Sequence, residues 1–130
     1  MKSRDSLLRL KRFQAEEKRR RVSQIELMVA EFSRMAGDLD REIAGEEQRS
    51  GISDPTHFAY STYARAARSR RDNLQHSAGE MRQQLEDAKA AYEAAIEEVA
   101  RAQNLEGREK AAERITDLPR DLETLGLRTA

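Results

Sequence analysis

The residue types that most often carry catalysis or bind metal are scarce and scattered in this sequence. The two histidines, His57 and His76, are 19 residues apart, which would separate them by about 30 Å along one straight helix. We therefore expect no shared metal: His57 is better explained as a polar residue in the first turn of a helix, and His76 as a solvated side chain. Acidic residues are abundant, but carboxylates at helical spacing usually form a solvated face, and no phosphate-binding loop or nucleophile motif occurs. We expect no catalysis, no cofactor, no metal and no small-molecule substrate.

A basic cluster is the first feature that indicates binding. The four residues from Lys18 to Arg21 are all cationic and lie within a basic segment, residues 9–21. Four consecutive residues point around the whole circumference of a helix, so they would not all face one neighbouring helix. Two interpretations stay open: a solvated face with some cross-helix pairing, or a surface that meets an acidic partner or phosphates. Nucleic acid is the less favoured partner, because the net charge is zero and no aromatic residues are interleaved around Arg19.

Three of the six aromatic residues lie close together, at Phe58, Tyr60 and Tyr63. One interpretation is a plug that closes the end of a thin coiled coil. The other is an exposed anchor for a partner protein, since aromatic residues are enriched in the centres of protein interfaces.

The element that must position these residues is a heptad repeat in the second half of the chain. Positions spaced alternately by four and three residues are apolar, with the single exception of Arg71, and this spacing is that of a left-handed coiled coil. The pattern continues for about six heptads, more than the three or four that indicate a coiled coil. The predicted seam consists of Tyr60, Ala64, Ala67, Arg71, Leu74, Ala78, Met81, Leu85, Ala88, Tyr92, Ala95, Val99 and Ala102. A seam this narrow needs one close partner helix.

That partner is predicted to be the first half of the same chain, giving an all-α, antiparallel two-helix coiled-coil hairpin. Residues 3–50 contain no proline and read as one helix, a turn follows at about 51–55, and a second helix covers about 56–116. Gly51 suits a left-handed C-terminal cap, and Ser53 or Asp54 suits the next N-cap, with Pro55 at the first helical position. So short a turn makes the helices antiparallel neighbours. We expect one domain over residues 1–116 and a tail, 117–130, that is either a frayed end or a short docking helix, because Pro119 ends or kinks the second helix.

The placement of charge supports the hairpin. In a hairpin centred near residue 53, facing residues have numbers that add to about 106, so the basic segment 9–21 would face the acidic stretch 85–97. The arginines between 65 and 71 would likewise face the acidic residues between 38 and 42. Such exposed pairs contribute less than about 1 kcal/mol each, but together they set orientation and register. The predicted seam contacts are Leu39 with Ala67, Phe32 with Leu74 and Ile25 with Met81.

Composition agrees with long helices rather than a globular core. The 130 residues include 24 basic and 24 acidic ones, charged residues make up 37%, and there is no cysteine or tryptophan. The mean hydropathy of −0.89 fits a coiled coil, and the unbroken heptads argue against disorder. The first residues lack the apolar core of a signal peptide and no stretch approaches about 18 apolar residues, so we expect a cytoplasmic protein.

Several strings of residues in this chain are shared with a known protein family. They are Leu8-Arg9-Leu10-Lys11-Arg12-Phe13-Gln14, Glu17-Lys18-Arg19-Arg20, Arg34-Met35-Ala36-Gly37-Asp38-Leu39-Asp40-Arg41-Glu42-Ile43, Gly51-Ile52-Ser53-Asp54-Pro55, His57-Phe58-Ala59-Tyr60 and Gln84-Leu85-Glu86-Asp87-Ala88. With these strings the chain resembles the FliJ family of flagellar export proteins, in particular its alphaproteobacterial branch. The resemblance covers roughly residues 4–100, and the turn with its aromatic residues is its most distinctive part. Beyond about Leu105 the sequence departs from the family pattern.

The resemblance implies a non-enzymatic component or chaperone of the flagellar type III protein export apparatus. Such a protein would be cytoplasmic, peripherally associated with the inner membrane at the flagellar base. It would bind the export ATPase ring like a central stalk, contact the cytoplasmic part of the export gate membrane protein, and in some members handle substrate chaperones. Carried onto this chain, the residues implied for partner binding are Arg12, Phe13, Lys18, Arg19, Arg20, Tyr60 and Tyr63. The alternative function is a generic coiled-coil scaffold or a homodimeric structural coil, and less plausibly a nucleic-acid-binding helix.

Overall fold

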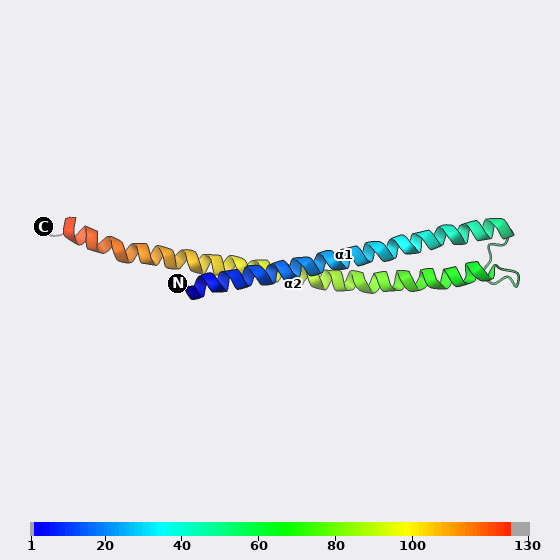
Figure 1. The fold of residues 1–130 in the computed structure, drawn as a ribbon, viewed down its shortest axis with the longest axis horizontal. Coiled ribbons are helices and arrows are strands. Elements are labelled where there is room, and N and C mark those ends of the chain that lie inside the picture. The colour runs from blue at the N-terminus through cyan, green and yellow to red at the C-terminus, as the bar shows by residue number, and fades with distance from the viewer. Residues whose placement is uncertain (1, 126–130) are drawn as a thin grey trace. The chain divides into compact units, whose positions relative to one another are not determined.

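The chain folds into two long antiparallel helices in the computed structural model, which describes residues 2–125 except the side chains of residues 2, 4 and 117–125. Helix α1 covers Lys2–Ser50 and helix α2 covers Thr62–Leu125 (Figure 1). The two helices pack against each other, and the described range contains no strand. The predicted all-α helical hairpin is confirmed.

The helices form two compact units. The first unit combines the chain up to Lys18 with the chain from Ala91 onward, and the second is the continuous segment Arg19–Ala90, which includes the turn. Each unit contains one stretch of α1 and one of α2, and each is described separately below. The prediction of one domain over residues 1–116 stays a prediction.

The seam of α2 is the one that the heptad repeat predicts. All thirteen predicted positions are buried or half-buried. Most alanines of the seam are buried, with exposed fractions of 0% at Ala64, 2% at Ala78 and 7% at Ala102. Small side chains leave little bulk between two helices, so the backbones approach closely and the methyl groups are covered.

The apolar spacing in the first half of the sequence predicts one stripe on α1, and the structure differs from it in part. The predicted positions are Ile25, Met28, Phe32, Met35, Leu39 and Ile43. Ile25 and Ile43 are buried at 2% and 4% exposure, and Phe32, Met35 and Leu39 are half-buried, as predicted. Met28, however, is 39% exposed. The stripe runs instead through Leu8, Ala15, Val22, Ile25, Val29, Phe32, Ala36, Leu39 and Ile43, which are buried or half-buried at heptad spacing. Position relative to α2, and not side-chain size, decides which residues are covered.

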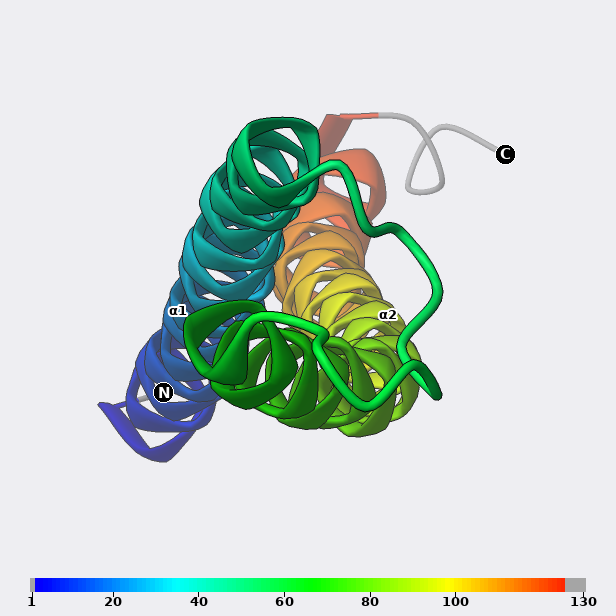
Figure 2. The same cartoon turned by 90° about the vertical axis from the view of Figure 1, so that its right-hand side faces the viewer.

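The turn is longer than the sequence predicts. Gly51 ends α1 with a φ of +73°, and its N–H donates to the carbonyl of Glu47 at 2.9 Å, which is the predicted left-handed cap. Helix α2 begins only at Thr62. Its N-cap is Ser61, whose hydroxyl oxygen accepts the N–H of Ala64 at 3.2 Å. The predicted caps at Ser53 and Asp54 are therefore wrong, and residues 51–61 form a loop that extends from the helix ends (Figure 2).

Helix α2 also continues further than predicted. It ends at Leu125 and not near residue 116, so its backbone passes through position 119. A proline removes one hydrogen bond of the helical ladder, and a helix can continue on either side of that loss. Residues 126–130 of the predicted tail lie outside the described residues. In the first unit α2 extends past the start of α1 (Figure 1).

The cross-helix contacts have residue numbers that add to between 105 and 115, against the predicted 106. The sum is 105 for Tyr63 with Glu42, 109 for Lys11 with Glu98, 111 for Arg71 with Asp40 and 115 for Arg68 with Glu47, so long side chains reach partners several residues away from the predicted position. Leu39 and Ala67 line one groove, as predicted. The contacts predicted for Phe32 with Leu74 and for Ile25 with Met81 stay predictions.

Candidate functional site

The basic segment of the first unit presents cations and one aromatic ring on the outer side of α1. Leu8 and Ala15 turn toward the seam at 7% and 9% exposure. Arg12 and Lys18 are exposed, and the Phe13 side chain is 58% exposed. Leu8 and Ala15 fill the seam, whereas Arg12, Phe13 and Lys18 are exposed. These three exposed side chains are therefore available to a partner.

Lys11 of this segment pairs across the hairpin, inside the first unit. Its amine lies 2.9 Å from Glu98 Oε2. The hydrogen bond from Lys11, followed by its charge, lowers the pKa of Glu98. This pair agrees in charge with the predicted pairing of segment 9–21 with segment 85–97, but Glu98 lies one residue outside the predicted acidic stretch. Glu86 and Glu97 pair within their own helix, with Lys89 at 3.8 Å and Arg101 at 3.5 Å.

The basic cluster continues into the second unit with Arg19, Arg20 and Arg21. All three side chains are exposed, as is Lys18. The four consecutive cations therefore do not all face α2, as expected, because every one of their side chains is exposed. Arg19 and Arg20 also interact with neighbouring residues, so part of their charge is already engaged.

The three aromatic residues near the turn separate into a plug and two exposed rings. The Tyr60 side chain is 4% exposed, whereas Tyr63 is 56% and Phe58 is 94% exposed. The Tyr60 hydroxyl donates to Glu47 Oε1 at 2.8 Å, and the Arg65 guanidinium carbon lies 5.7 Å from the centre of the ring. Burial, and then the hydrogen bond to Glu47, raises the pKa of Tyr60. Tyr60 therefore closes the end of the coiled coil, while Phe58 has the exposure expected of an anchor.

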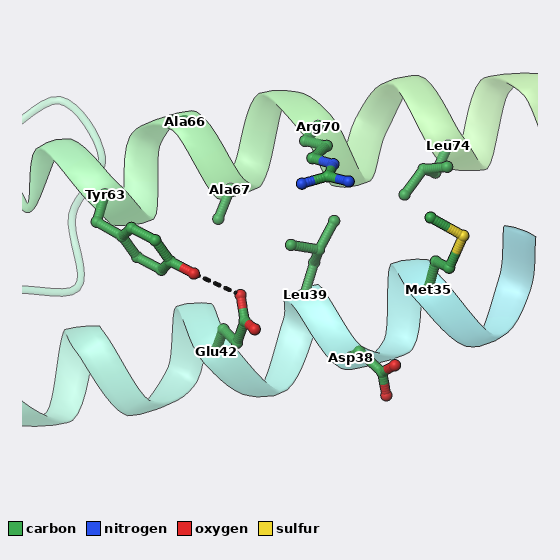
Figure 3. Close-up of a pocket in the computed structure, with 9 residues that line it drawn as sticks. All are labelled: Met35, Asp38, Leu39, Glu42, Tyr63, Ala66, Ala67, Arg70 and Leu74. Carbon is green, nitrogen blue, oxygen red and sulfur yellow. Dashed lines mark hydrogen bonds between the residues drawn. The ribbon is translucent and has the colours of Figure 1, made fainter.

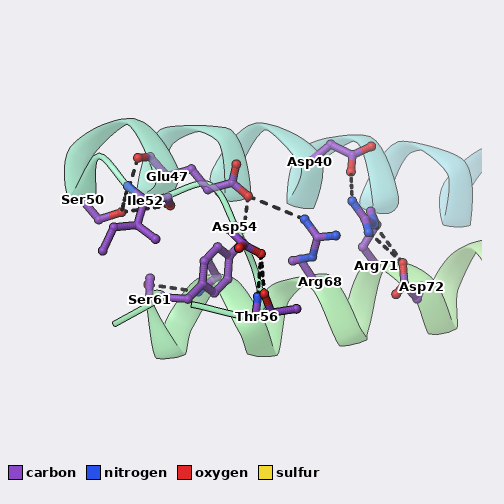
Figure 4. Close-up of polar contacts among 12 residues, drawn as sticks. Asp40, Glu47, Ser50, Ile52, Asp54, Thr56, Ser61, Arg68, Arg71 and Asp72 are labelled. Atoms are coloured by element: carbon purple, nitrogen blue, oxygen red, sulfur yellow. Dashed lines mark hydrogen bonds and ion pairs between the residues drawn. The ribbon is translucent and has the colours of Figure 1, made fainter. Parts of the chain in front are cut away.

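Two acidic residues of α1 form ion pairs with arginines of α2 close to the turn. Glu47 accepts the Tyr60 hydroxyl and lies 3.6 Å from Arg68, and Asp40 lies 3.0 Å from Arg71 (Figure 4). Arg71 also contacts Asp72 at 2.8 Å, and the hydrogen bonds to Asp40 and Asp72 raise its pKa. Arg71 is thus the polar layer in an otherwise apolar seam, a device that fixes register in coiled coils.

Next to the turn, the second unit contains a groove that the sequence analysis missed. It has a volume of about 340 Å³ and an apolar floor, with charged groups at its rim (Figure 3). At one end the Tyr63 hydroxyl donates to Glu42 Oε2 at 2.8 Å, and this bond raises the pKa of Tyr63. The residues that line the groove are Met35, Asp38, Leu39, Glu42, Tyr63, Ala66, Ala67, Arg70 and Leu74. The feature of the sequence that could have indicated this groove is the pair Ala66-Ala67 opposite Leu39, because small side chains facing a large one leave space between the helices.

The charges at the rim of the groove are unequally neutralised. Asp38 pairs with Arg34 at 3.0 Å and with Arg41, both on its own helix. Arg70, which the sequence placed opposite residues 38–42, forms no ion pair among the described residues, and its guanidinium lies over the groove (Figure 3). Arg70 is therefore an available cation beside an apolar floor.

The loop that presents Phe58 is held by its own hydrogen bonds. Asp54 Oδ1 accepts the N–H of Thr56 at 2.9 Å and its hydroxyl at 2.7 Å (Figure 4). These two bonds lower the pKa of Asp54. The Nδ1 of His57 accepts the N–H of Ala59 at 3.0 Å, and its ring stacks on Phe58 with centroids 4.7 Å apart. His57 thus lies in the loop and not in the first turn of a helix, which corrects the prediction.

His76 and the acidic side chains are the remaining residues that the sequence analysis considered for chemistry. His76 is solvated, as predicted, with Glu80 at 3.1 Å on the same helix. Among the described side chains, no group of three or more histidine, aspartate or glutamate residues is placed to hold a metal ion. No described helix is long and apolar enough to cross a membrane. Comparison with known proteins gave no match to a family model, a curated protein or a solved structure.

Proposed function

We propose that this protein is a non-enzymatic coiled-coil component of the flagellar type III export apparatus. In this role it binds the export ATPase ring like a central stalk and links that ring to the cytoplasmic part of the export gate. The observation that carries the proposal lies in the first unit: the seam is filled from within, while Arg12, Phe13 and Lys18 are exposed on α1. The sequence resemblance to FliJ proteins, whose members are helical hairpins, supports the same function.

The chemistry of this surface fits an acidic partner with an apolar contact point. Exposed cations steer a negatively charged partner and make its association rate depend on salt. An exposed aromatic ring between them can supply the contact energy that a desolvated anchor gives at an interface. A helix that carries both on one stretch suits insertion into a ring whose inner surface is acidic.

The turn is the second contact region of the proposal. Tyr63 is exposed and accessible to the gate or to a substrate chaperone. Tyr60 is covered and bonded to Glu47, so we assign it the role of holding the turn in shape. A cytoplasmic protein with peripheral attachment to the inner membrane at the flagellar base is part of the same proposal.

Binding of the full-length protein to the export ATPase of the same organism tests the proposal. The double variant Arg12→Gln/Lys18→Gln should weaken binding by about tenfold at 50 mM salt, and the difference should shrink at 200 mM salt. The matched control is Arg101→Gln/Lys110→Gln, which removes two exposed cations from α2 and should leave affinity within about twofold of the wild type. The absence of any affinity at low salt would refute the ATPase contact.

The loop between the helices argues against the alternative function, a homodimeric structural coil with helices that continue through residues 51–55. Such a coil requires a continuous helix there, whereas this segment belongs to the loop between α1 and α2.

A further inference from the structure

Phe58 is the most exposed of the large apolar side chains in the described part of the chain, at 94%, yet it is not on a loosely held segment. The loop around it is fixed by the bonds of Asp54 to Thr56 and of His57 to Ala59. Two turns complete the frame: the N–H of His57 donates to the Asp54 carbonyl, and that of Tyr60 to the His57 carbonyl, both at 3.1 Å. A fixed loop presents the ring to a partner with little loss of conformational entropy on binding.

The same unit carries a complementary concave surface. The groove of about 340 Å³ has a floor that includes Leu39, Ala67 and Leu74, and this volume is at the lower end of pockets that enclose a ligand. An aromatic ring is the kind of group that such a floor accepts. Phe58 does not occupy the groove of its own chain, because its side chain is exposed to solvent.

The charges beside the ring and beside the groove are of opposite sign. Asp54 is the one charged residue between Ser50 and Ser61, and like any exposed aspartate it is ionised at neutral pH. Arg70, at the groove, has no ion-pair partner among the described residues. The chain has no net charge, so two copies do not repel each other at long range.

From these three observations we propose that two copies of this chain associate through their turns, each inserting Phe58 into the groove of the other. Asp54 of each copy then faces Arg70 of the other. The groove begins at Tyr63, five residues after Phe58, and its centre lies within about 10 Å of the start of α2 at 1.5 Å per residue. Turns that overlap side by side therefore bring both rings to both grooves at once, which is a two-fold, self-complementary interface.

A lipid surface is a weaker match for the same ring. The segment from Ser50 to Ser61 contains no lysine or arginine, so it lacks the basic residues that hold peripheral proteins at anionic membranes. A single phenylalanine with one neighbouring carboxylate gives little membrane affinity. The proposal does not depend on the export function.

The first test measures self-association of the full-length protein by sedimentation equilibrium from 5 µM to about 1 mM. Because the interface is small, the dimer should dissociate with a constant between about 10 µM and about 1 mM. Phe58→Ala on one side, and Ala66→Phe as a block of the groove on the other, should each weaken the dimer at least about tenfold. Ala30→Phe, which adds the same ring at an exposed alanine that does not line the groove, should not. Circular dichroism should show the same helicity for all of them.

A second measurement locates the ring. The chain contains no tryptophan, so Phe58→Trp introduces a single reporter whose emission should shift to shorter wavelength when excess Phe58→Ala protein is added as groove donor. Addition of Phe58→Ala/Ala66→Phe protein should give no shift. Asp54→Asn, which keeps the hydrogen bonds of the loop, and Arg70→Gln should each weaken association, and the double variant should be no weaker than either one, because both remove the same pair.

Three results would overturn the proposal. The first is a wild-type protein that stays monomeric at about 1 mM. The second is a dimer that Phe58→Ala and Ala66→Phe leave intact, or that Ala30→Phe weakens equally. The third is a Phe58→Trp emission shift with anionic vesicles of phosphatidylserine and phosphatidylcholine but none with groove donor, which would assign the ring to a membrane. Should Ala66→Phe lose helicity, Arg70→Gln gives the independent test of the groove.

Discussion

Replacement of Ile25 by alanine should lower the free energy of unfolding by about 2.5–4 kcal/mol. Ile25 is 2% exposed at the centre of the α1 stripe. Alanine lacks three of its carbon atoms, each worth about 0.8 kcal/mol of transfer free energy, which gives about 2.4 kcal/mol. A further amount comes from the cavity that remains, and it is modest because a seam between two helices can partly close. The matched control is Leu27→Ala, two residues along the same helix at 71% exposure, which should cost no more than about 0.7 kcal/mol.

Urea denaturation followed by the helical signal at 222 nm measures both values. The protein concentration should stay near 5 µM, so that self-association does not contribute. The midpoint should fall strongly for Ile25→Ala and little for Leu27→Ala, with an unchanged slope for both. Equal losses for the two variants would refute the assignment of the seam, because they would mean that Ile25 and Leu27 are equally buried.

Further predictions concern the turn, the glycines and the cross-helix ion pair. Phe58→Ala should change the stability of the monomer by less than about 0.5 kcal/mol, because the ring is 94% exposed; urea denaturation at 5 µM checks this. Gly37→Ala should stabilise the folded chain by about 0.5–1 kcal/mol, since the added Cβ meets nothing within 4 Å. Gly51→Ala should destabilise the folded chain by about 1 kcal/mol, because the φ of Gly51 is +73°. In thermal melts followed by circular dichroism, the midpoint should rise for Gly37→Ala and fall for Gly51→Ala. The pKa of Glu98 is lowered from 4.5 by Lys11, so this pair stabilises the folded chain above about pH 4.5, and the contribution is lost as pH falls through the lower, folded-state pKa. Lys11→Met should therefore be less stable than the wild type at pH 7, with a difference that shrinks on acidification in urea titrations at each pH; a constant difference would contradict the pair.

The sequence predicted the helices and their mutual arrangement well, because both depend on a repeated pattern. The α2 seam is defined by thirteen positions at heptad spacing, and a pattern of that length averages out single exceptions such as Arg71. The cap at Gly51 was also predictable, since few other residues adopt a positive φ. On α1, by contrast, Met28 and Val29 are adjacent apolar residues, and nothing local shows which of them faces α2.

The turn and the groove were harder to predict because they depend on tertiary contacts. Asp54 and Pro55 have the composition of an N-cap, but Asp54 instead caps a turn at Thr56, and Tyr60 lies where its hydroxyl reaches Glu47. That contact favours a loop up to Ser61 over an earlier start of α2. The groove follows from which small residues of α2 face Leu39, and this is visible only once the register is known. The division of the aromatic cluster into a buried Tyr60 and an exposed Phe58 depends on the same loop.

The central claim, a role in flagellar export, is tested most directly by the export of filament protein into the culture medium. Cells whose own copy is deleted should be complemented by the wild type and by Arg101→Gln/Lys110→Gln, and not by Arg12→Gln/Lys18→Gln produced at the same level. The account predicts loss of exported filament protein in the deletion strain and in the Arg12/Lys18 variant, with general secretion unchanged. Normal filament export without this protein would contradict it.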